Sequence, residues 1–147
     1  MLFEHDAASV LERLCERLEA HRSRPRAILG CSYPFEGSTF GEILDCIADA
    51  LQIDYGNLNR IPIDVVCDAK LYRGHTPDAR YRVHLYPHSE LLHPKLLIVL
   101  LEDQVLWISG SGNITRAGFC SNREIMLLHE PDDLTLPAPL RKLLISP

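Results

Sequence analysis

The chain has 147 residues, of which 46% are hydrophobic and 24% are charged, and its formal net charge at pH 7 is −5. This length and apolar content are enough to bury one substantial core, so we expect a single domain over residues 1–147. The negative charge excludes a broadly basic nucleic-acid-binding surface and leaves only local basic clusters for such contacts.

Apolar periodicity organises the first part of the chain. Residues 6–21 carry apolar side chains at helical spacing, which predicts a helix, and residues 27–32 have the apolar composition of a core strand. Thr39 and Glu42 have the spacing of a capping box, which predicts the start of a second helix. That helix is expected to bury five residues: Phe40, Ile43, Leu44, Ile47 and Leu51.

Five further segments are short apolar runs typical of strands. Together with the two helices they predict an α/β protein, a mixed β-sheet flanked by helices. Residues 131–147 are rich in proline and then apolar, which indicates a linker followed by a small docking helix or by a truncation. The predicted strands are 63–67, 82–86, 96–101, 104–109 and 125–128.

The five cysteines are an odd number, and no two of them form a Cys-x-x-Cys pair. This pattern indicates neither a complete disulfide framework nor a zinc site, so we expect most of the cysteines to be buried thiols in a reducing cytoplasm. The first residues lack a basic segment followed by a long apolar run, and no apolar segment is long enough to span a bilayer. We therefore expect a cytoplasmic protein without stable membrane association.

Several aromatic and histidine residues have structural interpretations. Tyr33 and Phe35 follow the first strand, where sites of α/β proteins often form, but we expect them to pack in the core or in a loop. Trp107 lies in an apolar strand segment and is expected in the core. His84 and His88 are expected on the surface.

His93 and Lys95 are the first two residues of a group able to attack and hold a phosphate. They are two residues apart beside the apolar run 96–101, so on a strand both side chains point to the same face. The pattern therefore predicts an imidazole next to an ammonium.

The segment 109–113, Ser-Gly-Ser-Gly-Asn, ends the returning strand and is expected near this pair. Its small residues let backbone amides, together with the side chains of Ser111 and Asn113, approach an anion closely. Glu124 opens the next short strand, and its carboxylate can accept the imidazole N–H of His93, which would fix the tautomer and orientation.

This constellation resembles the phospholipase D superfamily, whose signature combines His-x-Lys, Gly-Ser-x-Asn and a later Asn-x-Glu. The family aspartate five positions after the lysine would fall at Leu100. The tyrosyl-DNA phosphodiesterase branch also lacks that aspartate, and its spacing between histidine and asparagine is similar. The residues that match the signature are His93, Lys95, Gly110, Ser111, Asn113, Asn122 and Glu124.

The resemblance implies a phospholipase D-like half-domain that cleaves a phosphodiester without a metal or other cofactor. His93 would attack phosphorus to give a phosphohistidine, while a second histidine protonates the leaving oxygen and later activates water. Lys95 and Asn113 would hold the nonbridging oxygens, assisted by Ser111. Three further residues are expected to contact the substrate: Gly110, Gly112 and Arg116.

A second motif is missing from this chain, although the superfamily site normally combines two. No other histidine is followed by the lysine of the signature. A symmetric homodimer with two copies of His93 facing across the axis is the simplest source of the second histidine. A second half-domain in a longer protein is the competing explanation.

We expect the substrate to be nucleic acid, in particular DNA, and the activity to be that of a nuclease or a DNA-end-processing enzyme. One alternative is a catalytically silent module that serves as an interaction or nucleic-acid-binding domain of a larger protein. The joint presence of His93, Lys95, Asn113 and Glu124 favours the enzyme. A phospholipid-acting enzyme ranks last, because the sequence lacks an amphipathic basic segment to hold a membrane.

Overall fold

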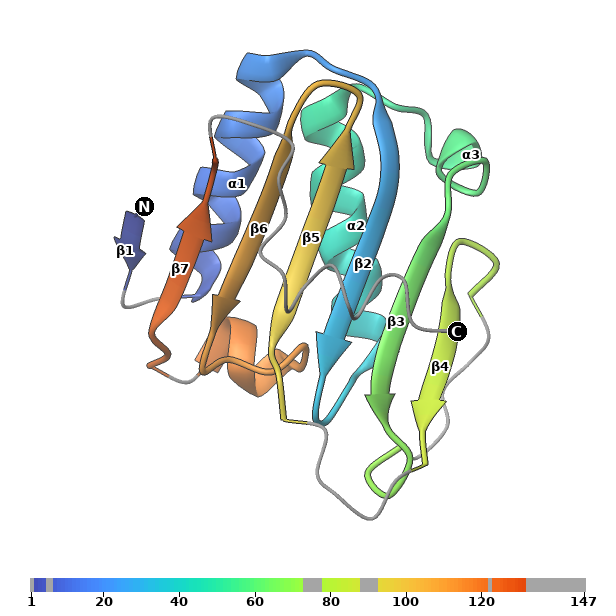
Figure 1. Cartoon of the computed structure of the whole chain (residues 1–147), viewed down its shortest axis with the longest axis vertical. Coiled ribbons are helices and arrows are strands. Elements are labelled where there is room, and N and C mark those ends of the chain that lie inside the picture. The colour runs from blue at the N-terminus through green and yellow to red at the C-terminus, as the bar shows by residue number, and fades with distance from the viewer. Residues whose placement is uncertain (1, 5–6, 73–77, 88–92, 122, 132–147) are drawn as a thin grey trace.

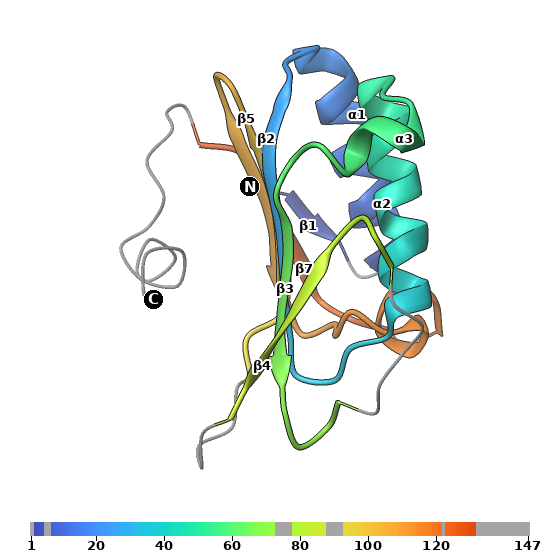
Figure 2. The same ribbon diagram turned by 90° about the vertical axis from the view of Figure 1, so that its right-hand side faces the viewer.

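The computed structural model describes residues 2–4, 7–72, 78–87, 93–121 and 123–131. They form one seven-stranded mixed sheet in the order β1-β7-β6-β5-β2-β3-β4, with α1 and α2 on the same face (Figures 1 and 2). The expected α/β architecture is confirmed. The strands are β1 (Leu2–Glu4), β2 (Pro25–Ser32), β3 (Ile63–Asp68), β4 (Arg82–Tyr86), β5 (Leu96–Leu101), β6 (Val105–Gly110) and β7 (Met126–His129). The helices are α1 (Ala7–His21), α2 (Gly37–Leu51), the short α3 (Tyr55–Leu58) and the π-helix η1 (Ala117–Ser121).

The directions of the strands bring the termini of four of them to the same end of the sheet. β2 pairs in parallel with β3 and antiparallel with β5, so that Cys31 near the end of β2 lies opposite Leu96 at the start of β5. Ser109 near the end of β6 lies opposite Leu96 on the other side, and Gly110 lies opposite Met126, the first residue of β7. The ends of β2 and β6 and the starts of β5 and β7 therefore meet at the lower edge in Figure 1.

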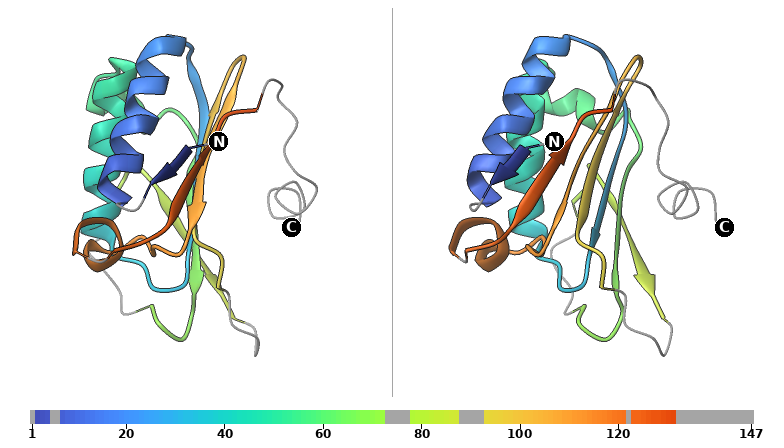
Figure 3. Two further views of the ribbon diagram at one scale, coloured as in Figure 1. Left: turned by 90° about the vertical axis from the view of Figure 1, so that its left-hand side faces the viewer. Right: turned by 60° about the vertical axis from the view of Figure 1, so that its left-hand side comes forward.

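The main core lies between the two long helices and the sheet (Figure 3). Leu14 and Leu18 of α1 and Phe40, Leu44 and Ile47 of α2 are fully buried, and burying a side chain of this kind contributes about 1.5–3 kcal/mol. Leu51 is only partly buried. Alternate residues of the strands complete this core, among them Ile28, Val65, Leu97, Val99, Leu106 and Ile108.

The other face of the sheet carries a second apolar cluster. Trp107 of β6 is 7% exposed and packs there with Ile98 and Leu96 of β5 and with Cys31 of β2. The prediction that Trp107 lies in the core is therefore confirmed.

The predicted capping box at Thr39 and Glu42 is wrong. α2 begins two residues before Thr39, and its N-cap is Glu36, whose side chain makes no capping hydrogen bond. The Glu36 carboxylate instead accepts hydrogen bonds from the backbone N–H of Arg116 at 2.6 Å and from Thr39 Oγ1 at 3.1 Å. Its N–H donates to the carbonyl of Ile114 at 2.8 Å. A contact distant in sequence thus determines where α2 starts.

The remaining elements agree with the sequence analysis to within two residues at the bounds that it gave. β1, α3 and η1 were not predicted. Of the expected linker and docking segment at 131–147, residues 132–147 lie outside the described part of the chain. None of the described helices is long and apolar enough to cross a membrane.

Candidate active site

His93 and Lys95 form the centre of the candidate site. Both precede β5, which begins at Leu96, so the prediction that they lie on a strand is wrong. Their side chains nevertheless converge: Lys95 Nζ lies 3.0 Å from His93 Nδ1 and 3.1 Å from Nε2, and it donates to the His93 carbonyl oxygen at 2.9 Å. His93 is exposed, whereas Lys95 is 9% exposed. The imidazole is therefore open to a substrate while the ammonium is shielded from water.

The buried ammonium of Lys95 is in an unusual environment. Burial lowers its pKa below the ordinary value of 10.5, and the nearby Glu124 carboxylate and Cys31 thiol oppose that shift. A cation that has lost much of its water interacts more strongly with an anion than a solvated one does. Lys95 is thus placed to bind a phosphate oxygen beside the imidazole.

Ser111 links the loop after β6 to the segment before β7. Its Oγ donates to Glu124 Oε2 at 2.5 Å and accepts from the Ile125 N–H at 3.0 Å. Its own N–H donates to the Ile125 carbonyl at 3.0 Å. These three bonds fix the loop, and they give Glu124 a partner in Ser111. A role for Glu124 in orienting His93 remains a prediction.

The glycines of this region allow close backbone contact. A Cβ on Gly110 would overlap the carbonyl oxygen of Ile125, and a Cβ on Gly112 would lie 3.1 Å from the carbonyl oxygen of Gly118. A Cβ on Gly118 would in turn overlap the carbonyl oxygen of Asn113 and lie 2.7 Å from its nitrogen. Gly110 and Gly112 therefore shape the loop, and their contact with substrate stays a prediction.

Asn113 stands where this loop turns toward η1. Its carbonyl accepts from the Thr115 N–H at 2.8 Å, and its Oδ1 is buried with no hydrogen-bond partner among the described residues. A buried amide without a partner costs about 1–3 kcal/mol. Rotating the amide by half a turn would put its NH₂ donors in the same place. Contact of this amide with a substrate stays a prediction.

Tyr33 is a residue of this site that the sequence analysis assigned to packing. Its ring centroid lies 5.3 Å from that of His93 at an interplanar angle of 47°, and Lys95 Nζ lies 5.9 Å from the Tyr33 centroid. Tyr33 directly follows β2, and the antiparallel pairing of β2 with β5 brings it here. Its position at the end of a central strand was the available signal. Phe35 does pack in the core, as expected, against Phe40.

Arg116 does not line the pocket beside His93. A pocket of about 390 Å³ beside His93 is lined by residues 93–96 and 109–111. Arg116 is not among them, because its exposed guanidinium pairs with Glu42 of α2 at 3.3 Å. Asn122, which matches the family signature, lies outside the described residues.

No three His, Cys, Asp or Glu side chains in the described part of the chain are arranged to hold a metal ion. The groups that the described residues bring together here are a ring nitrogen and an ammonium, from His93 and Lys95. Asn113 does not line the pocket beside His93, so its part in the site stays a prediction. An imidazole beside an ammonium suits attack on a phosphate and stabilisation of the charge that develops on its oxygens.

Comparison with known proteins bears on the fold. No protein-family model and no curated protein sequence matches the chain. Among solved structures, it is similar to Nuc from Salmonella typhimurium, a phospholipase D family member, with a TM-score of 0.55 and 17% identity over 90% of this chain and 81% of Nuc. It is also similar to NucT from Helicobacter pylori, with a TM-score of 0.53 and 14% identity over 89% of this chain and 87% of NucT.

A third similar structure is yeast tyrosyl-DNA phosphodiesterase, with a TM-score of 0.51 and 15% identity over 98% of this chain but only 36% of the yeast enzyme. At these identities the likeness establishes the fold. The chain has the fold of the phospholipase D superfamily, as the spacing of its motif predicted. It corresponds in length to most of Nuc or NucT and to about a third of the yeast enzyme.

Proposed function

We propose that this chain is a metal-independent phosphodiesterase that acts on nucleic acid, in particular DNA, through a phosphohistidine on His93. The observation that carries the proposal is the buried ammonium of Lys95 in contact with the exposed imidazole of His93. This pair of residues lies in a fold that the chain shares with two proteins. One is Nuc, a phospholipase D family member, and the other is yeast tyrosyl-DNA phosphodiesterase. The same chemistry serves a nuclease or an enzyme that processes DNA ends.

The first step forms a bond between a ring nitrogen of His93 and phosphorus, while the bond from phosphorus to the leaving oxygen breaks. The leaving oxygen takes its proton from a second histidine acting as general acid. A nonbridging oxygen replaces the imidazole as the partner of Lys95 Nζ, and the Asn113 amide donates to the other nonbridging oxygen. The contact between Lys95 and His93 supports entry of the phosphoryl group at this position.

The second step hydrolyses the phosphohistidine and regenerates the free enzyme. The second histidine, now neutral, takes a proton from water, the water oxygen attacks phosphorus, and the bond between phosphorus and His93 breaks. The products are a phosphate monoester and the free imidazole. Ser111 supports both steps through the loop, because its hydroxyl hydrogen is already donated to Glu124.

A second copy of His93 from a homodimer partner is the source we propose for the general acid. A twofold contact places the same residue on both sides of the axis. His93 is exposed just before the start of β5, so the described part of the chain leaves its side chain open to a partner. A second half-domain in a longer chain would supply the same group by the same geometry.

The phosphohistidine is tested by trapping it. The full chain is mixed with bis(p-nitrophenyl) phosphate in EDTA, quenched in alkali, and measured by intact-protein and peptide mass spectrometry. We expect a p-nitrophenyl phosphate adduct on the peptide that contains His93, absent from His93→Ala and retained in the control His84→Ala, which changes another exposed histidine. An adduct on another residue, or unchanged hydrolysis by His93→Ala, contradicts the proposal.

Substrate class is tested on the same preparations. Labelled single-stranded and duplex DNA, RNA of the same sequence and phosphatidylcholine vesicles are compared as substrates in EDTA. We expect cleavage of DNA to be fastest and to disappear in His93→Ala. Faster release of the headgroup from vesicles would show that the enzyme acts on lipid.

The shared site is tested by mixing subunits. If two copies of His93 act together, random exchange of wild-type and His93→Ala protomers in equal amounts leaves about a quarter of the activity, since only wild-type pairs are active. Independent sites leave about half. The second result, or an active monomer by light scattering, rules out the homodimeric source of the general acid.

A further inference from the structure

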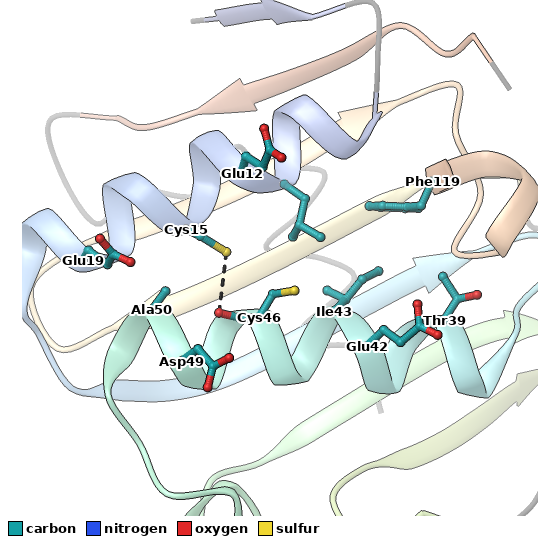
Figure 4. A pocket seen from close by; sticks show the side chains of 11 residues that line it. Glu12, Cys15, Glu19, Thr39, Glu42, Ile43, Cys46, Asp49, Ala50 and Phe119 are labelled. Atoms are coloured by element: carbon teal, nitrogen blue, oxygen red, sulfur yellow. Dashed lines mark hydrogen bonds between the residues drawn. The ribbon is translucent and has the colours of Figure 1, made fainter. Parts of the chain in front are cut away.

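A groove runs between α1 and α2 on the outer side of the helical layer (Figure 4). Its volume is about 360 Å³. Apolar side chains line it, including Leu11 of α1 and Ile43 and Ala50 of α2. Phe119 of η1 forms one end of it, so the groove is separate from the pocket beside His93.

Every charged side chain that lines the groove within the described residues is acidic. Glu12 and Glu19 lie on the side formed by α1, and Glu42 and Asp49 lie on the side formed by α2 (Figure 4). Glu42 also pairs with Arg116, which stands outside the groove lining. The groove thus has an apolar floor and a negative rim along both helices.

The groove also contains two thiols, those of Cys15 and Cys46, which carry no charge at neutral pH. The pKa of Cys15 is raised to about 12, mainly by burial and in smaller part by the nearby Cys46, Glu19, Asp49 and Glu12. Cys15 Sγ donates to the backbone carbonyl of Cys46 at 3.6 Å, as Figure 4 shows. Burial is also the largest cause of the raised pKa of Cys46. At neutral pH both thiols are protonated, so the negative charge of the groove comes from its carboxylates.

We infer that this groove binds an amphipathic helix of a partner protein, with an apolar face toward Ile43 and Phe119 and with lysines and arginines along both flanks. Two adjacent helices present a ridge-lined groove of the kind that a third helix enters through side chains at i, i+3, i+4 and i+7. The lining residues of α2 run from Thr39 to Ala50, a length of about 17 Å that matches roughly three helical turns.

The negative charge of the groove rim determines which kind of partner helix can bind. The four rim carboxylates would repel an acidic helix and attract a basic one, and they lie on both sides of the apolar floor. The inference is independent of the phosphodiesterase proposal, because no groove residue belongs to the His93 site.

The test uses a defined probe and the full chain. The probe is a fluorescein-labelled 14-residue peptide with leucines at helical spacing and lysines elsewhere, and fluorescence anisotropy at 0.15 M salt gives its Kd. We expect at least tenfold weaker binding to the double variant Glu12→Lys, Glu19→Lys. Cys46→Trp, which fills the groove from an exposed position, should weaken binding as much. The matched control is Glu16→Lys, Asp103→Lys, which changes the net charge equally at exposed positions outside the groove.

Four results would overturn the inference. Equal weakening in the control double variant would show non-specific attraction to an acidic protein. Absent binding, or equal binding of a peptide with glutamate in place of lysine, would remove the charge argument. A wild-type dimer that Cys46→Trp converts to monomer by light scattering would show that a second copy of the chain occupies the groove. Circular dichroism of each variant confirms that the fold is retained.

Discussion

The Nζ atom of Lys95 lies within 3.1 Å of both ring nitrogens of His93 and 2.9 Å from the His93 carbonyl oxygen. The ammonium is buried and the imidazole is exposed. Lys95 therefore holds the histidine segment in place through the backbone while its charge faces the reactive ring. A phosphate oxygen that reaches this ammonium would lie next to the proposed nucleophile at the same time.

The first prediction concerns the alkaline limit of activity. Burial favours the neutral amine, so the pKa of Lys95 lies below 10.5 and its proton leaves at a lower pH than that of an exposed lysine. We expect kcat/KM to fall on the alkaline side with an apparent pKa below 10.5. A profile of kcat/KM against pH, measured with bis(p-nitrophenyl) phosphate, checks this.

Lys95→Arg and Lys95→Met are the companion variants. Arg keeps its charge at every accessible pH but has a planar head of different shape, so we expect reduced activity without the alkaline limb. Met removes the donor, and loss of one such donor costs about 10²–10³ in kcat. If Lys95→Arg keeps the same alkaline limb, the limb belongs to another group.

A second prediction concerns Gly118 of η1. A Cβ there would overlap the Asn113 carbonyl oxygen, so Gly118→Ala must displace the loop that carries Asn113. We expect about 1–3 kcal/mol of destabilisation from overpacking, and a displacement of about 1 Å costs on the order of 10² in kcat. Urea unfolding and kcat on the same preparation measure the two effects.

Gly56→Ala is the matched control, because nothing lies within 4 Å of a Cβ at Gly56 in α3. Its free energy of unfolding should stay within about 0.5 kcal/mol of wild type. An unimpaired Gly118→Ala enzyme would mean that the backbone contact with Asn113 does not support the site.

The third prediction separates the ring of Tyr33 from its hydroxyl. The contacts to His93 and Lys95 are made by the aromatic ring. Tyr33→Phe should therefore keep near wild-type kcat, whereas Tyr33→Leu should lower it several-fold, because the stacking surface that positions the imidazole is lost. Equal losses in both variants would instead assign the role to the hydroxyl.

A fourth prediction concerns the attachment of β7 to α1. Glu130 accepts from Arg17 Nε at 2.6 Å and from Arg17 Nη2 at 2.9 Å, and it lies 2.6 Å from His21 Nε2. The hydrogen bond from Arg17 is the largest cause that holds the pKa of Glu130 below 4.5. Because the folded carboxylate is the stronger acid, its stabilising effect is complete above about pH 4.5 and is lost as the pH falls through its folded pKa.

Glu130→Gln should consequently lower the free energy of unfolding by about 1 kcal/mol at pH 7. The difference in the free energy of unfolding between wild type and Glu130→Gln should shrink as the pH falls through the folded pKa of Glu130. Urea unfolding at pH 7 and in acid measures both values. The control is Glu16→Gln, whose exposed carboxylate is 4.0 Å from Arg13 and should contribute little. A difference that grows in acid would contradict this account of Glu130.

The strands were predictable because their sequences carry the signal locally. Residues 96–101 are an uninterrupted apolar run, and the structure makes them β5 with five of its six residues buried. The α/β architecture followed from that pattern, and the phospholipase D fold was implied by the resemblance of His93, Lys95 and Asn113 to the family signature.

The parts that sequence did not predict depend on contacts between distant segments. The start of α2 is set by the contacts of Glu36 with Ile114 and Arg116, so a local capping pattern misplaced it. Tyr33 reaches His93 only through the pairing of β2 with β5. Gly118 is required because η1 packs against the backbone of Asn113, a contact that the sequence does not reveal. No local pattern contains these relationships.

The measurement that tests the central claim most directly is the rate of bis(p-nitrophenyl) phosphate hydrolysis in EDTA by wild type and by His93→Ala. Circular dichroism is needed to establish that both are folded. The account predicts chelator-resistant hydrolysis by wild type and its loss in His93→Ala. Hydrolysis that persists in His93→Ala, or a folded dimeric wild type without activity, would contradict it.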